Sequence, residues 1–278
     1  MTELSLLRDL ARRLPAIGDD CAIVPNGRED LLLKVDMFIE DVHFRRTERT
    51  AADAGYRALA RALSDIAAMG GRPRWALVGL ALPPWATKRW IDGFYNGFLE
   101  LAKSTGTELV GGDLSHARQL VADVFVCGTV PRGQALRRST AQAGDALYVS
   151  GPLGHRKWRF EPRLALGQQL RRSKNVTACM DISDGLAVDL HRLAAASGLE
   201  AQLTNIPAAR GAGQHKALHY GEDYELLFAR RGEWRGSPPG IHRIGTLQQG
   251  PRPGRVVLVQ NGKSVLVPAV GYDHLKQS

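Results

Sequence analysis

The chain has few cysteines and no long apolar segment. Cys21, Cys127 and Cys179 lie far apart without the spacing of a metal site, and their odd number argues against a disulfide framework. We therefore expect buried, reduced thiols in a cytoplasmic protein. No apolar run reaches membrane-spanning length, and the N-terminus lacks the apolar core of a signal peptide. A disulfide-rich secreted domain and a membrane protein are excluded, so we expect no membrane partner.

The familiar nucleotide-binding signatures are also missing. The sequence contains no Walker loop, no Rossmann fingerprint and no kinase catalytic loop. It also lacks zinc-finger spacing and an aromatic RNA-binding signature, although its net charge is +9 and basic residues cluster between His155 and Lys174. This charge fits a solvated basic face or the attraction of small phosphorylated ligands. We expect no nucleic-acid partner, and any chemistry on ATP must use a different scaffold.

What the chain does have is the composition of a globular protein. Its 278 residues are 44% apolar and 23% charged, enough for one large domain or two ordinary ones. A domain boundary is expected near residues 131–133. Apolar periodicity predicts helices around 58–66, over 90–103 and from residue 186, and a hairpin over 254–267 that turns at Asn261-Gly262. Strands are predicted at 31–35, 74–83, 108–114, 120–130, 144–151 and 176–180.

The segment 180–194, MDISDGLAVDLHRLA, gathers acids where a strand gives way to a helix. Asp181 and Asp184 flank Ser183, and apolar residues then recur at helical spacing. Ser183 or Asp184 is expected to be the N-cap of this helix. Capping leaves Asp181 unexplained, and carboxylates at a strand end often hold Mg²⁺, which in turn holds phosphate. The motif alone supports capping and metal binding equally.

Further acids recur at the expected ends of elements. Asp19-Asp20 follows a glycine, Asp36 is expected to end a strand, Asp65 lies in or beside a helix, and Asp113 follows Gly111-Gly112. A glycine pair lets a backbone approach a ligand closely. Each acid alone is typical of a turn, a cap or a solvated charge, whereas the set suggests a Mg²⁺ cluster. LSDIAAMG at 63–70 also resembles ISDGLAVD at 182–189, which suggests a duplication.

Seven motifs, taken in order, resemble those of thiamine-monophosphate kinases. They are GDDCA, DMFIEDVHF, LSDIAAMGGRP, GGDLS, DISDGL, GEDYEL and the terminal GYDHL. The resemblance covers nearly the whole chain, and DISDGL and GEDYEL are its most specific parts. This family shares a superfamily with aminoimidazole ribonucleotide synthetase, selenophosphate synthetase and a hydrogenase maturation factor.

The resemblance implies an α/β (α+β), two-domain fold of the aminoimidazole ribonucleotide synthetase type. Residues 1–131 would bind ATP and Mg²⁺ and form a homodimer through their sheet, residues 132–278 would form a second α/β domain, and the active site would lie in the cleft. The implied Mg²⁺ ligands are Asp20, Asp36, Asp65, Asp113, Asp181 and Asp184. The implied ATP contacts are Gly112, Arg138 and Ser183. Arg138 suits this role because a guanidinium fits phosphate oxygens. The residues implied around thiamine monophosphate are His43, Glu222 and Tyr272.

The implied reaction is phosphorylation of thiamine monophosphate to thiamine diphosphate, with no covalent phosphoenzyme. The chain departs from the family at Lys34 and Val35, where Ser or Thr is usual, and it is short near 151–163 and 205–221. An ammonium cannot ligate Mg²⁺, because it has no lone pair. Strand alternation puts Lys34 on the same face as Asp36, so we expect Lys34 near the acids and not in solvent. The alternatives are a non-catalytic nucleotide-binding homologue and another ATP-using enzyme of the superfamily.

Overall fold

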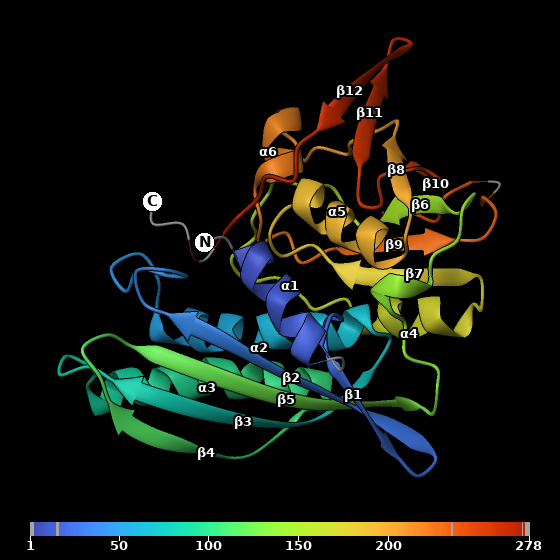
Figure 1. Ribbon diagram of the computed structural model, residues 1–278. Coiled ribbons are helices and arrows are strands. Elements are labelled where there is room, and N and C mark those ends of the chain that lie inside the picture. Colours follow the sequence, from blue (N-terminus) through green and yellow to red (C-terminus); the bar gives the residue numbers. More distant parts are fainter. Residues whose placement is uncertain (1–2, 15–16, 235, 274, 276–278) are drawn as a thin grey trace. The chain divides into compact units, whose positions relative to one another are not determined.

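The computed structural model describes residues 3–14, 17–234, 236–273 and 275 (Figure 1). The chain divides into two compact units. One comprises residues 21–135 and 158–164, and the other comprises residues 1–20, 136–157 and 165–278. We call them the five-stranded unit and the seven-stranded unit, after their sheets. The domain boundary expected after residue 131 stays a prediction.

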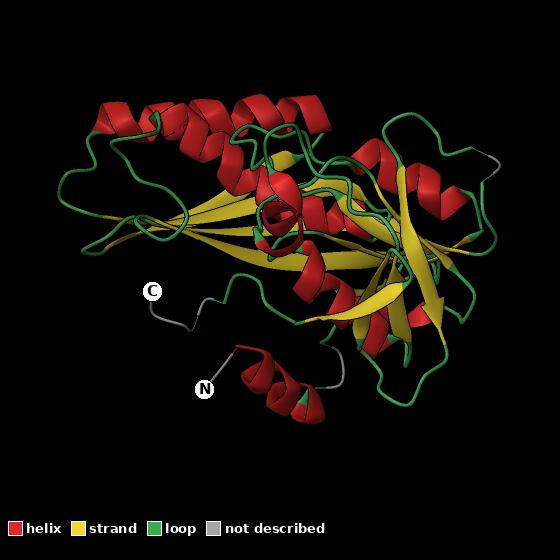
Figure 2. Ribbon diagram, turned by 90° about the horizontal axis from the view of Figure 1, so that it is seen from above, coloured by secondary structure: helices red, strands yellow, loops and turns green. Residues whose placement is uncertain are grey.

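The five-stranded unit is a sheet with two helices on one face. Its strands are β1 (Ala22–Asn26), β2 (Glu29–Ile39), β3 (Arg72–Leu82), β4 (Glu108–His116) and β5 (Val121–Pro131), in the order β1-β2-β5-β3-β4. Only β3 and β4 run parallel within this sheet as described. The helices α2 (Ala51–Ala68) and α3 (Lys88–Thr105) lie side by side along the sheet (Figures 1 and 2). Thr50 and Thr87 cap their N-termini through side-chain oxygens, which satisfies amides that would otherwise lack partners.

The two faces of this sheet differ in burial. Cross-strand register places Lys34, Val126 and Ala76 in one row, and the apolar residues of such helix-facing rows are buried. The next row, Val35, Phe125 and Leu77, points to the other face because side chains alternate along a strand. On that face Val35 is 53% exposed and Leu77 is 38% exposed. The second face therefore carries exposed apolar side chains, and neither α2 nor α3 of this unit lies on it (Figure 2).

The seven-stranded unit contains a mixed sheet of strand order β12-β11-β8-β10-β6-β9-β7. Its strands are β6 (Ala146–Val149), β7 (Val176–Asp181), β8 (Glu200–Leu203), β9 (Leu226–Arg230), β10 (His242–Gln248), β11 (Val256–Gln260) and β12 (Lys263–Val267). Its helices are α1 (Glu3–Arg13), the 3-10 turn η1 (Arg138–Thr140), α5 (Leu186–Ala196) and α6 (Gly213–His219); α4 (Leu164–Arg172) begins at the junction of the units. The core forms where leucines and alanines of α5 and α6 pack against the sheet.

Most predicted elements are confirmed, and the exceptions concern the acids. The β11–β12 hairpin turns at Asn261 and Gly262, both with positive φ, as expected of this dipeptide. Asp36 does not end a strand, because β2 stays paired with β5 as far as Ile39. Asp113 likewise lies within β4. The suggested duplication is not reflected in local structure, since Asp65 lies inside a helix and Asp184 lies before one.

All three cysteines are buried free thiols, as the sequence predicted. No helix among the described residues is long and apolar enough to cross a membrane.

Candidate functional site

The segment 181–185, from the last residue of β7 to the start of α5, is the centre of the site in the seven-stranded unit. Three consecutive carbonyl groups of this loop accept hydrogen bonds from backbone amides of two distant segments. The amides donate from Tyr224 to Ile182 (2.9 Å), from Glu222 to Ser183 (2.7 Å) and from Tyr272 to Asp184 (3.0 Å). The motifs DISDGL, GEDYEL and GYDHL are therefore joined into one structure through main-chain hydrogen bonds.

Two glycines make this close approach possible. A Cβ atom on Gly221 would lie 2.3 Å from the carbonyl oxygen of Ser183, and one on Gly271 would lie 2.4 Å from that of Asp184. In both cases the obstructing atom is a backbone carbonyl oxygen, so no side-chain movement could relieve the contact. The spacing of Glu222 and Tyr272 from the loop thus depends on the absence of side chains at the preceding positions.

The start of α5 differs from the sequence prediction. The N-cap is Gly185, with φ of 120°, and it makes no side-chain capping bond. Neither Ser183 nor Asp184 caps the helix, so that prediction is wrong. Instead, Oδ2 of Asp189 accepts hydrogen bonds from the amides of Asp184 and Gly185, each at 3.1 Å. An acid inside the helix thus reaches back to the amides of the N-cap residue and of the residue before it, as the acid of a capping box does for the N-cap amide.

Arg192 completes this arrangement one turn further along α5. Its Nη1 donates to Oδ1 of Asp189 at 2.8 Å and also to Oδ2 of Asp184. Asp189 is fully buried. Burial and the negative charge of Asp184 raise the pKa of Asp189, while Arg192 opposes the increase. Sequence reasoning missed both residues, although one signal was available: Asp189 interrupts the apolar stripe of Leu186, Leu190 and Leu193.

Asp20 and Asp181 form a buried pair of carboxylates in the same unit. Each is 3% exposed, and one oxygen of each lies within 4.8 Å of the other. Arg138 donates from Nη2 to Oδ1 of Asp20 and from its backbone amide to Asp19 at 2.9 Å. Burial alone would lower the pKa of Arg138, but the neighbouring carboxylates, Asp20 foremost, raise it. Oδ2 of Asp20 is buried and has no hydrogen-bond partner among the described residues.

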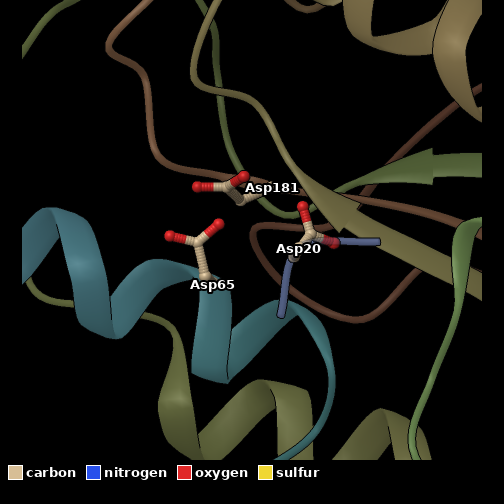
Figure 3. Close-up of side chains that lie close together, drawn as sticks. All are labelled: Asp20, Asp65 and Asp181. Atoms are coloured by element: carbon tan, nitrogen blue, oxygen red, sulfur yellow. The ribbon is translucent and has the colours of Figure 1, made fainter. Parts of the chain in front are cut away.

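Figure 3 labels Asp20, Asp181 and Asp65; of these, Asp65 belongs to α2 of the five-stranded unit. Within that unit, Nζ of Lys34 lies 2.8 Å from Oδ1 of Asp65. Nη2 of Arg61 lies 3.2 Å from Oδ1 of Asp36. Burial would lower the pKa of Lys34, but Asp65 and Asp36 more than compensate and raise it. The expectation that Lys34 lies near the acids is confirmed.

The remaining predicted residues of the five-stranded unit are arranged differently. Nδ1 of His43 accepts the amide of Ile39 at 2.9 Å, so the neutral ring carries its proton on Nε2. Gly112 is required by packing, since a Cβ atom there would lie 2.0 Å from the carbonyl oxygen of Val78. Asp113 is exposed on β4. Among the described residues, Asp36, Asp113 and Asp184 belong to no group of three or more acids, histidines or cysteines close enough to hold one metal ion.

The GEDYEL segment is held in an unusual conformation. Glu222 and Tyr224 have positive φ values of 69° and 50°, which are uncommon for residues with side chains. Between them, Asp223 accepts hydrogen bonds from the amides of Gly154 (2.9 Å) and His155 (3.2 Å). Burial raises the pKa of Asp223 to about 6, although these amides oppose the shift. Asp223 therefore fixes the segment that carries Glu222.

Comparison with known proteins first defines the class of fold. Residues 18–130 match the family model described as AIR synthase related protein, N-terminal domain. A solved structure of hydrogenase maturation protein HypE has a TM-score of 0.75 at 18% identity and covers 92% of this chain and 94% of its own. At that identity the likeness concerns the fold alone. The chain thus has the AIR synthase-like architecture expected from its motifs.

Closer relatives define the family. Thiamine-monophosphate kinase of Bacillus subtilis is 33% identical over 94% of this chain and 93% of its own. The enzyme of Rhodopirellula baltica is 37% identical over 81% of this chain and 80% of its own. A solved structure described as AaThiL complexed with AMPPCP and TMP is 30% identical, has a TM-score of 0.88, and covers 99% of this chain and 97% of its own. The chain belongs to the thiamine-monophosphate kinase family.

The raised pKa of Asp223 predicts a dependence of stability on pH. The folded state holds this proton up to a pH of about 6, whereas the unfolded chain releases it near the ordinary value of 3.8. Asp223 therefore makes stability fall as pH rises from about 4 to about 6, and contributes no slope above that range. We expect Asp223→Asn to remove this component of the slope, measured by urea unfolding at several pH values. Asp92→Asn, at an exposed acid of α3, is the control. Identical slopes in Asp223→Asn and wild type would contradict the assignment.

Proposed function

We propose that this protein transfers the γ-phosphoryl group of ATP to thiamine monophosphate, giving ADP and thiamine diphosphate. Membership of a phosphotransferase family supports this reaction. The observation that carries the proposal is the buried pair Asp20 and Asp181, whose oxygens approach within 4.8 Å. Two buried carboxylates so close together repel each other unless cations stand beside them. Arg138 supplies one positive charge, and Oδ2 of Asp20 still lacks a hydrogen-bond donor among the described residues.

The acids of this chain fit a magnesium-dependent reaction. The proposed ligands are Asp20, Asp36, Asp65, Asp113, Asp181 and Asp184. Carboxylate oxygens are the ligands that Mg²⁺ prefers, and the unpartnered oxygen of Asp20 fits a cation. Bound Mg²⁺ would neutralise charge on the phosphates of ATP.

The proposed substrate contacts extend the same reasoning. Gly112, Arg138 and Ser183 are assigned to ATP, and His43, Glu222 and Tyr272 to thiamine monophosphate. For Ser183, Glu222 and Tyr272, support comes from the hydrogen bonds that join their three segments. The carboxylate of Glu222 could accept a hydrogen bond from the pyrimidine amino group, and the ring of Tyr272 could stack on a heterocycle. Tyr272 is 41% exposed, which leaves its ring accessible.

No side chain needs to act as a nucleophile. A phosphate oxygen of thiamine monophosphate attacks the γ-phosphorus in line, and the bond from that phosphorus to ADP breaks. The contribution of the protein is then to orient the two substrates and to place positive charge beside the transferring group. Arg138 is suited to the second role, because its guanidinium has several donors in a fixed plane.

A second candidate function is nucleotide binding without catalysis. It is favoured by the cations already placed on predicted metal ligands, above all Lys34 on Asp65 and Arg138 on Asp20. The same contacts also suit an enzyme whose basic residues turn toward phosphate when ATP binds. Under either function, the three buried free thiols support a cytoplasmic location, where cysteines stay reduced.

We also propose a homodimer formed through the open face of the five-stranded sheet. That face exposes Val35, Met37, Trp75 and Leu77, each at least 38% accessible. Register places Val35 and Leu77 on either side of Phe125 in a single row across three strands. An apolar surface of this kind is typical of a protein–protein contact. A second copy presenting the same face would cover it.

The first functional test is a direct assay. Incubation with ATP, Mg²⁺ and thiamine monophosphate should yield thiamine diphosphate, detected by chromatography. Asp181→Asn keeps the shape of the side chain but loses its charge, so we expect kcat to fall by on the order of 100-fold or more. Asp92→Asn, at an exposed acid paired with Lys88, should retain the wild-type rate.

Binding measurements then separate the two candidate functions. If no thiamine diphosphate forms while an authentic kinase succeeds under the same conditions, the catalytic proposal is wrong. Tight binding of ATP in that case would favour the non-catalytic function. An unchanged rate in Asp181→Asn would show that this acid is structural.

The dimer is tested by sedimentation at assay concentrations. We expect wild type to sediment as a dimer and Val35→Asp to sediment as a monomer, because the new charges would face each other across the contact. Val265→Asp provides the matched control, since Val265 is 60% exposed on β12 in the other unit. A monomeric wild type, or a dimeric Val35→Asp, would rule out this interface.

A further inference from the structure

Two rows of charged residues face each other between β2 and α2. Lys34 and Asp36 lie two apart on β2 and point to the helix side of the sheet. Arg61 and Asp65 lie four apart on α2 and share one side of that helix. The pairing is crossed, with Lys34 on Asp65 at 2.8 Å and Arg61 on Asp36 at 3.2 Å. Asp36 and Asp65, the two acids of these rows, thus each have a basic partner within the protein.

The Lys34–Asp65 pair differs from an ordinary surface ion pair. The side chains of Lys34 and Asp65 are 28% and 9% exposed, against 87% and 56% for Lys88 and Asp92 on α3. Exposed pairs are weakened by solvent, whereas partly buried ones are screened much less. Solvent therefore weakens the attraction between the ammonium of Lys34 and the carboxylate of Asp65 less than it weakens the Lys88–Asp92 pair.

This contact bears on metal binding because Asp65 is one of the proposed Mg²⁺ ligands, and its contact with Lys34 lies within the five-stranded unit. A lysine ammonium has three donors and no lone pair, so it cannot itself become a metal ligand. It holds Oδ1 of Asp65, and its charge repels a divalent cation at the same carboxylate. Val35, the next residue, has no side-chain oxygen to offer in compensation.

We propose that Lys34 is a built-in counter-ion at Asp65, which takes the place of one divalent cation. Wild-type protein then binds fewer divalent ions than its acidic residues would otherwise accept. Removal of the ammonium opens Asp65 to an additional ion. The inference rests on the proposed function only in that these acids bind divalent cations, and it does not require turnover.

The test is a titration with Mn²⁺, which substitutes for Mg²⁺ and whose free form is counted by electron paramagnetic resonance. The full-length protein is titrated with a non-hydrolysable ATP analogue present. We expect Lys34→Ser to bind one more Mn²⁺ per chain than wild type. Lys34→Arg keeps the positive charge and should match wild type. Lys88→Ser removes a lysine from an exposed pair and should also match wild type.

A second measurement, the melting temperature Tm with and without Mn²⁺, applies to variants that fold poorly without metal. Lys34→Met keeps the aliphatic stem but leaves Asp65 without the ammonium, so its Tm should fall. Mn²⁺ should then raise the Tm of Lys34→Met more than it raises that of wild type. Equal Mn²⁺ stoichiometry in Lys34→Ser and wild type, or equal Mn²⁺ shifts in Tm for Lys34→Met and wild type, would overturn the proposal. The kinase assay is separate: absent turnover with the extra Mn²⁺ present would refute the function and leave this inference standing.

Discussion

The carboxylate of Asp189 is the interaction on which the rest of the site depends. One of its oxygens accepts the amides of Asp184 and Gly185, and the other accepts Arg192. The loop that bears Ser183 is thereby fixed at the start of α5, and its carbonyl groups point to the amides of Glu222, Tyr224 and Tyr272. Because Asp189 is fully buried, removing one of these donors would leave a buried oxygen without a hydrogen-bond partner, at a cost of about 1–3 kcal/mol.

Basic residues accompany most of the proposed metal ligands. Arg138 contacts Asp20, Arg192 contacts Asp184, Arg61 contacts Asp36 and Lys34 contacts Asp65. These basic side chains are therefore placed beside acids and do not contribute to a basic face. Such pairs allow a chain to fold around carboxylates that would otherwise repel one another. They also supply cations next to the positions proposed for phosphate.

Much of this could be predicted from the sequence, and the parts that could not have physical causes. Periodicity located α5, which buries one apolar face, and a continuous apolar run located β7, which is buried on both faces. Ordered motifs located the loop of residues 181–185 and its two companion segments. The N-cap was predicted wrongly, because capping preference concerns side chains placed before a helix, whereas this helix start is held by Asp189, which reaches back from inside the helix to the amides of Asp184 and Gly185. The position of Asp36 within β2 was missed because strand pairing with β5, a long-range property, extends the strand to Ile39.

The role of Asp189 in positioning this loop is tested most directly by measuring the affinity of Asp189→Asn for Mn²⁺ in the presence of an ATP analogue. Asp189 is not among the proposed metal ligands, so its effect must act through the position of the loop. We predict that Mn²⁺ affinity falls by about 10-fold or more in a folded Asp189→Asn variant. Glu200→Gln, at another buried acid of the same unit, should bind Mn²⁺ as wild type does. Wild-type affinity in Asp189→Asn, or an equal loss in Glu200→Gln, would contradict it.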